Sequence, residues 1–192
     1  MAYSSKYGFI FARHLNPSVS VPAVIEVTLA NSAGPLTVGD LVRYSSGYLV
    51  GCPITTAYLG VLAGFVTKNG ENIFKTKSSL SGTKSGDDTY TASSSNVTVD
   101  MVRGEVVVDV EALFFAYNDT TLTQAYVGTW FNGKVNDGTY VDGLTGTGAA
   151  YSAGSYQFQL IELVTVGEDG TALTTAGLWR MGRNTIAIND AT

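Results

Sequence analysis

The chain has 192 residues, of which 11 are Lys or Arg and 16 are Asp or Glu, so its formal net charge is −5. Charged residues make up only 14% of the chain and hydrophobic residues 45%, which excludes disorder of the whole chain and a long coiled coil. The acidic balance argues against a nucleic-acid groove, which needs clustered Lys and Arg. We therefore expect a compact, β-rich fold.

The first 20 residues are predicted to form an extended N-terminal arm (residues 1–20). They contain no long apolar core of the kind that marks a signal peptide, and no later apolar run approaches the ~20 residues of a membrane span, so we expect no membrane partner. The aromatic residues Tyr3, Tyr7, Phe9 and Phe11 lie at odd positions, so a strand would place all four on one face. Such an apolar stripe needs a partner surface, in the same chain or in a neighbour.

After the arm, short apolar and β-branched runs alternate with Gly, Asn, Asp and Ser, as in antiparallel β-sandwiches and β-barrels. Dipeptides that favour tight turns lie between or beside these runs, namely Ser46-Gly47, Asn69-Gly70, Asn132-Gly133, Asp137-Gly138 and Asp169-Gly170. Short helices near Val110–Tyr117 and Thr120–Tyr126 are the only helical alternatives. The predicted strands are Tyr7–Ala12, Ala23–Ala30, Leu41–Tyr44, Tyr48–Val50, Tyr58–Thr67, Val97–Met101, Glu105–Tyr117, Gln124–Phe131 and Tyr156–Val166, with Thr139–Val141 and Leu178–Met181 as shorter candidates.

Two stretches of small and polar residues, Ser78–Ser95 and Asp142–Ala153, predict long irregular loops. Strand-like runs resume on both sides of each loop, so neither has the character of a domain linker. We therefore expect residues 21–192 to form a single all-β domain. Two β-subdomains divided by the 78–95 loop are the alternative.

The residue types needed for catalysis are scarce. A Ser-His-Asp or Cys-His site would have to use His14, which we expect instead to be exposed or at an interface. The single cysteine, Cys52, excludes an internal disulfide and is expected to be a half-buried filler. Gly143, Gly146 and Gly148 lack the Lys that completes a phosphate-binding loop. We therefore predict no catalytic residue, no metal site and no cofactor.

The most regular set of carboxylates is Glu105, Asp109 and Glu111, which a continuous strand would place on one face, opposite a row of valines. Paired carboxylates serve glycoside hydrolysis or cation binding. The simpler expectation is a solvated sheet face, or contact with basic groups of an adjacent subunit. The candidate interface residues are thus Tyr3, Tyr7, Phe9, Phe11, Glu105, Asp109 and Glu111.

One part of the chain resembles a known family. The segment Leu36-Thr-Val-Gly-Asp-Leu-Val is followed by a Gly-marked hairpin and then by Tyr58-Leu-Gly-Val-Leu-Ala-Gly-Phe. Over Pro35–Val66 this order is similar to the small β-barrel head decoration, or capsid cement, proteins of tailed bacteriophages. Met101-Val-Arg-Gly and Asn136-Asp-Gly-Thr-Tyr-Val look similar to further turns of such a barrel.

The resemblance implies a virion structural protein without enzymatic activity, made in the host cytoplasm and placed on the capsid surface. Its expected partners are the major capsid protein or other virion subunits, and copies of itself, with a trimer favoured. A phage tail-tube or connector subunit is one alternative. A carbohydrate-binding β-sandwich that stacks Trp130 and Trp179 on sugar rings is another, and a glycoside hydrolase using Glu105 or Glu111 ranks last.

Overall fold

The computed structural model describes residues 8–30, 35–52, 58–67, 72–73, 89–91, 101–134, 143–149, 158–167 and 170–182. Within these ranges the chain is all-β, as predicted, and a 3-10 turn, η1 (Gln124–Tyr126), is the one helical element. The strands are β1 (Ile10–His14), β2 (Val24–Thr28), β3 (Pro35–Thr37), β4 (Leu41–Ser45), β5 (Tyr48–Gly51), β6 (Gly60–Thr67), β7 (Asn72–Ile73), β8 (Thr89–Thr91), β9 (Met101–Val107), β10 (Ala112–Tyr117), β11 (Trp130–Lys134), β12 (Gly143–Ala149), β13 (Phe158–Val166) and β14 (Ala172–Met181).

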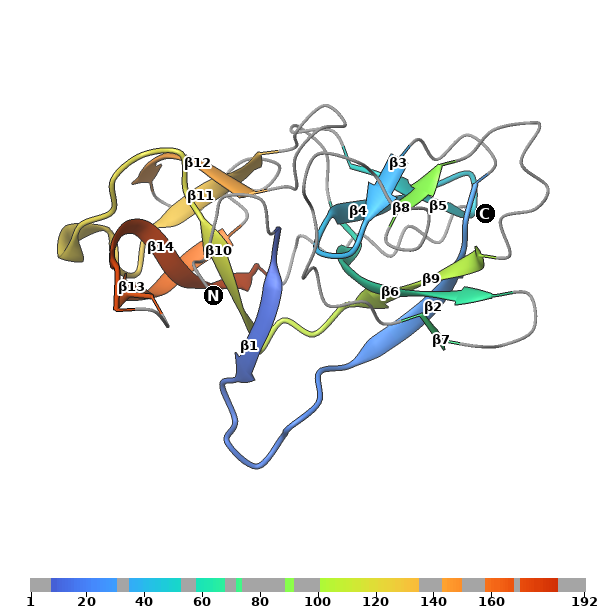
Figure 1. Cartoon of the computed structure of the whole chain (residues 1–192), viewed down its shortest axis with the longest axis horizontal. Helices are drawn as coiled ribbons and strands as arrows, with labels where there is room; N and C mark the ends of the chain where they lie inside the picture. Colours follow the sequence, from blue (N-terminus) through green and yellow to red (C-terminus); the bar gives the residue numbers. More distant parts are fainter. Residues whose placement is uncertain are drawn as a thin grey trace.

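Two antiparallel sheets organise these strands (Figure 1). Sheet A has the order β1-β10-β14-β13-β11-β12, and sheet B has the order β2-β9-β6-β4-β5, with β7 paired to β6. β3 and β8 form a separate two-stranded ribbon. Neither sheet closes on itself, so of the two predicted architectures the structure favours a sandwich-like packing over a barrel.

Sheet B nevertheless curls strongly. Leu29, just after β2, bridges to Leu49 of β5, and the N–H of Ala30 donates to the Leu49 carbonyl at 3.1 Å. The two outer strands of the sheet therefore approach each other at one end. This curl encloses a core formed by Val27, Leu29, Leu36, Val42, Leu49, Leu59, Leu62, Phe65 and Val106.

A second core lies between the two sheets. Sheet A contributes most of it, including the fully buried Trp179, and sheet B contributes residues such as Leu41 and Val61. Alternate residues of β4 and β6 thus point into different cores, because Val42 and Leu62 belong to the core inside sheet B. Sheet B is apolar on both faces for this reason, and its runs read as continuous hydrophobic stretches.

The hairpin of β4 and β5 confirms the turn predicted at Ser46-Gly47. Both residues have positive φ, 51° and 81°, as a type I′ turn requires. Gly170 also has a positive φ, 81°, in the turn between β13 and β14. The turns predicted at Asn69-Gly70 and Asp137-Gly138, and the strand predicted at Thr139–Val141, lie outside the described residues.

The turn predicted at Asn132-Gly133 is wrong, because both residues lie inside β11 and pair with β12. Gly133 is needed there for close packing of the two sheets. A Cβ at this position would lie 2.7 Å from Cδ1 of Leu41 and closer still to the hydroxyl of Tyr58. Leu41 belongs to β4 of sheet B, and Tyr58 lies just before β6 of the same sheet.

The two predicted long loops and one predicted strand also need correction. Most of the loop predicted over Asp142–Ala153 is strand β12, held by its ladder to β11 and anchored by the buried Leu144. In the loop predicted over Ser78–Ser95, Thr89–Thr91 forms β8, and the rest lies outside the described residues. The strand predicted over Gln124–Phe131 begins only at Trp130, because η1 and a turn at Gly128 (φ 88°) precede it.

The strand predicted over Glu105–Tyr117 is two strands. β9 ends at Val107 in sheet B, and β10 begins at Ala112 in sheet A. The backbone N–H of Glu111 donates to Oδ1 of Asp109 at 2.9 Å, which turns the chain at this point. The predicted single face carrying Glu105, Asp109 and Glu111 therefore does not exist.

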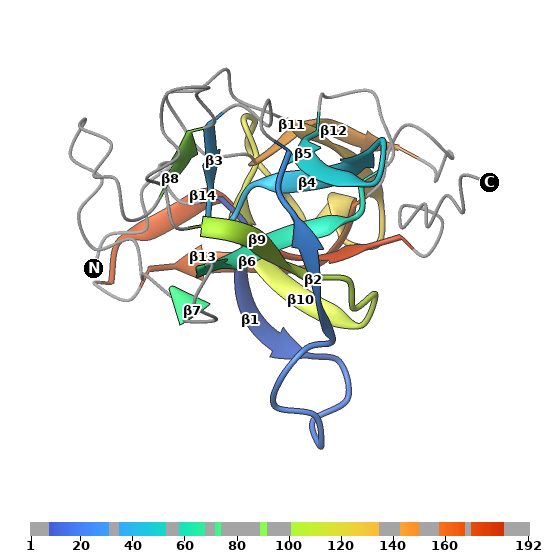
Figure 2. The same ribbon diagram turned by 90° about the vertical axis from the view of Figure 1, so that its right-hand side faces the viewer.

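The chain crosses between the sheets at a second place nearby. β1 adds to the edge of sheet A, beside β10, and residues 15–23 then lead to β2 at the edge of sheet B. We call residues 15–23 the crossover segment. Both ribbon views show it projecting away from the two sheets (Figures 1 and 2).

Candidate functional site

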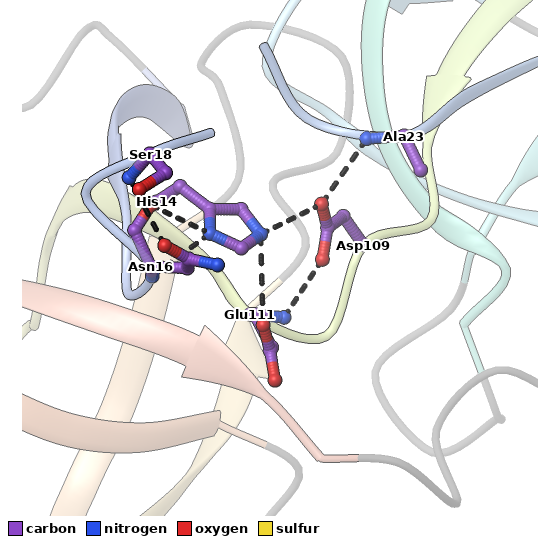
Figure 3. A network of polar contacts seen from close by, with 6 residues as sticks. All are labelled: His14, Asn16, Ser18, Ala23, Asp109 and Glu111. Atoms are coloured by element: carbon purple, nitrogen blue, oxygen red, sulfur yellow. Dashed lines mark hydrogen bonds and ion pairs between the residues drawn. The ribbon is translucent and has the colours of Figure 1, made fainter. Parts of the chain in front are cut away.

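The candidate site is the point where both crossings between the sheets meet. Asp109 lies in the connection from β9 to β10, and His14 ends β1 at the start of the crossover segment (Figure 3). Ala23 lies at the other end of that segment, directly before β2. We call His14, Ala23, Asp109 and Glu111 the clasp.

Asp109 accepts three hydrogen bonds. Its Oδ1 accepts from the N–H of Glu111 at 2.9 Å, and its Oδ2 accepts from the N–H of Ala23 and from Nε2 of His14, both at 3.1 Å. Burial alone would raise the pKa of Asp109. The N–H donors of Glu111 and Ala23, together with His14, outweigh burial and hold that pKa below its ordinary value.

His14 has a side chain that is only 6% exposed, so of the two expectations for it, exposure is wrong and a place at an interface stays a prediction. The N–H of Asn16 donates to Nδ1 at 2.9 Å. With Nδ1 as the acceptor of this bond, Nε2 carries a proton and donates to Asp109. Nδ1 also lies 3.2 Å from the carbonyl oxygen of Asn16. Both ring nitrogens are occupied by this chain's own groups.

Glu111 completes the clasp more loosely. Its Oε2 lies 3.8 Å from Nε2 of His14, and its side chain is 51% exposed. The backbone contributes more, because the carbonyl of Glu111 accepts from the N–H of Leu15 at 2.9 Å. A groove of about 460 Å³ opens beside the clasp between β1, the crossover segment, Leu113 and Ile161.

The chemistry available to this arrangement is limited. A histidine acting as general base must present one nitrogen to a substrate proton, and here an N–H fills one nitrogen and a carboxylate the other. Within the described part of the chain, no three His, Cys, Asp or Glu residues come together as a metal site. The clasp is suited to fastening the crossover segment to the turn between β9 and β10.

The predicted site residues are scattered by the fold. Tyr3 and Tyr7 lie outside the described residues. Phe9 is 3% exposed and stacks on Phe158 with ring centroids 4.8 Å apart, and both Phe9 and Phe11 meet Phe114 edge to face. The apolar stripe of the arm was expected to pack on a surface of the same chain or of a neighbour. The rings of Phe9 and Phe11 pack on the same chain.

The three predicted carboxylates also separate. Asp109 and Glu111 belong to the clasp, whereas Glu105 is buried in β9, opposite Glu26 of β2. Burial, and then repulsion from Glu26, raise the pKa of Glu105. Glu26 itself pairs with Arg103 at 2.6 Å.

The two tryptophans differ in their surroundings. Trp179 is fully buried, and its Nε1 donates to the carbonyl of Ala116 at 3.1 Å. Trp130 is half-buried, with the guanidinium of Arg180 6.0 Å from its ring centroid. Trp179 is therefore a core residue without a ring face for a sugar. Cys52, expected to be half-buried, is fully buried and forms no disulfide.

Comparisons of the chain with protein-family models, with curated protein sequences and with solved structures returned no match. Among the described residues, no helix is long and apolar enough to span a membrane.

Proposed function

We propose that this protein is a virion structural protein, a decoration protein that binds the outer surface of a phage capsid. The strands β4 and β5, and all but the last residue of β6, fall within Pro35–Val66, where the sequence resembles capsid decoration proteins. Their order, a strand, a Gly-turned hairpin and a returning strand, is the order that the resemblance implies. This agreement supports the proposal.

The observation that carries the proposal is the placement of exposed apolar side chains. Of the seven large hydrophobic residues exposed within the described ranges, five fall between residues 10 and 24. Val21 is 70% exposed and Val24 is 42% exposed. They lie where the projecting crossover segment joins β2, and such a concentration is typical of a protein-binding surface.

The strand that follows these valines provides the geometry for attachment. β2 pairs with β9 on one side and forms the outer strand of sheet B on the other. An extended segment of a capsid subunit can add to such an edge through backbone hydrogen bonds, while Val21 and Val24 bury against it. Repetition over a symmetric capsid multiplies a modest affinity at each contact.

The test is co-sedimentation of the purified protein with capsids of the same phage that lack it. Val21→Ser with Val24→Ser removes the two apolar contacts, at about 1 kcal/mol each, and we expect binding per copy to fall by about 30-fold. Val166→Ser is the matched control, because Val166 is 59% exposed on β13, away from the crossover segment. Equal binding by all three proteins would reject this attachment surface.

A further inference from the structure

We propose that β1 exchanges between copies of this chain, so that β1 of one copy pairs with β10 of a second copy and Phe9 fills that copy's core. The inference goes beyond attachment to a capsid and does not rest on it. It concerns the free protein and identifies the partner surface as a second copy of this chain.

The first observation is how β1 is joined to the rest of the fold. Its neighbour in sequence, β2, lies in the other sheet, and only the crossover segment connects them. The last residue of β1, His14, and the last residue of the segment, Ala23, both donate to Oδ2 of Asp109, so the two ends of the segment lie close together. Nine residues can span about 30 Å when extended, so the closed form uses almost none of this reach.

The second observation concerns the site on which β1 packs, the edge of β10 together with Phe114 and Phe158, which every copy of the chain presents. β1 pairs with β10 in the register Ile10–Phe115 to His14–Ala112. Phe9 adds its ring contacts with Phe158 and Phe114. An arriving β1 from another copy would restore all of these contacts, so exchange has no net cost within the docking site.

The third observation is that the crossover segment is held weakly. At its two ends the segment is tied to the turn between β9 and β10 by the clasp, by the Leu15 N–H, and by the Ala23 carbonyl, which accepts from the N–H of Val108 at 3.0 Å. Between these ends its backbone hydrogen bonds are local turns, from the N–H groups of Ser18 and Val19 to Asn16. Leu15 and Val19 are 42% and 36% exposed. In an exchanged assembly the crossover segments run past one another, which gives these side chains an apolar surface to bury. Reciprocal exchange closes a dimer, and cyclic exchange closes a larger ring such as a trimer.

The test is a disulfide that records which chain each β1 belongs to. Arg13 and Leu113 are opposite each other on β1 and β10, so the full chain with Arg13→Cys and Leu113→Cys is oxidised mildly. It is then denatured with an alkylating agent, which blocks Cys52, and its mass is read on a non-reducing gel. Exchange predicts covalently linked chains at twice the chain mass or more.

Gln159→Cys with Arg180→Cys is the matched control, because these residues pair between β13 and β14 of one chain. It should give only single-chain mass. Ile10→Cys with Phe115→Cys provides a second pair across β1 and β10 if the first does not fold or oxidise. Single-chain mass from the β1–β10 pairs, or light scattering that finds only single chains of the wild type, would overturn the proposal.

A readout without added cysteines follows the rate at which isotope-labelled and unlabelled assemblies mix, measured by native mass spectrometry. Exchange requires the clasp to open, so we expect Asp109→Asn to speed mixing by about tenfold. Glu111→Gln, which alters only the 3.8 Å contact, should leave the rate within twofold of the wild type. An unchanged rate in Asp109→Asn would contradict exchange through opening of the crossover segment.

Discussion

Replacement of Asp109 by Asn tests the clasp in the folded chain. The carboxylate accepts two backbone N–H groups and the His14 ring, and its side chain is 15% exposed. Hydrogen bonds to a charged group contribute about 1.5–3 kcal/mol each when buried. Asn keeps one acceptor oxygen and presents an NH₂ group to the other donors, so we expect a loss of about 2 kcal/mol at pH 7.

For a chain of this length, that loss corresponds to a fall in Tm of about 4–8 °C, measurable by calorimetry. The effect depends on pH with a definite sign. Because the pKa of Asp109 is lowered in the folded state, its stabilisation is complete above the ordinary Asp pKa and is lost as the pH falls through the lowered value. The difference between the wild type and Asp109→Asn should therefore shrink as the pH falls below the ordinary Asp pKa, about 3.9.

Glu111→Gln is the control in the same turn. Its carboxylate is half-exposed and lies 3.8 Å from the imidazole, so the expected change is below about 0.5 kcal/mol. Equal Tm values for Asp109→Asn and Glu111→Gln at pH 7, or a difference between the wild type and Asp109→Asn that does not shrink as the pH falls, would refute the role assigned to the Asp109 carboxylate.

Three further substitutions probe the cores. Glu105→Gln should stabilise the protein by about 1 kcal/mol at pH 8 and not at pH 4. Burial and Glu26 raise the pKa of Glu105. A carboxyl group with a raised pKa destabilises the folded state once the pH rises through that pKa, and Gln removes this effect. Gly133→Ala should lower the stability by about 2–3 kcal/mol in urea unfolding, because its Cβ would collide with Tyr58. Phe9→Ala should cost about 3–5 kcal/mol in the same assay, as expected for a buried aromatic side chain.

The glycine and phenylalanine substitutions have matched control variants, and Glu105→Gln is compared at two pH values. Gly170→Ala has open space around its Cβ and a φ of 81°, so it should cost only about 1 kcal/mol. Ile10→Ala, next to Phe9 but 38% exposed, should cost well below what Phe9→Ala costs. A Phe9→Ala variant as stable as Ile10→Ala would mean that Phe9 is not part of the core, and a Glu105→Gln effect of equal size at both pH values would exclude titration as its cause.

The sequence predicted the all-β class and the strands in which local pattern and burial agree. The hairpin at Ser46-Gly47 has a two-residue turn that requires positive φ, and the alternating run that ends at Val166 is one strand. The local sequence pattern did not predict the backbone conformation where packing between the two sheets determines it. Asn132-Gly133 has the composition of a turn, but Gly133 lies in a strand because Tyr58 and Leu41 leave no room for a side chain.

The clasp was also beyond the local pattern, because His14 and Asp109 are 95 residues apart in sequence. One signal could have indicated the break in the chain near Asp109. A predicted strand over Glu105–Tyr117 exceeds the usual length of 3–10 residues, and Asp favours turns by accepting the N–H two residues later. That signal would have placed the crossing between the sheets, though not the histidine that closes it.

The proposal of a capsid decoration protein is tested most directly by mass spectrometry of purified virions, with full heads and separated tails analysed in parallel. We expect this chain in the head fraction, in a copy number that follows the capsid symmetry, and its loss from heads of the Val21→Ser, Val24→Ser double variant. Its presence only in tails would favour the tail-tube alternative, and its absence from virions would contradict the proposed function.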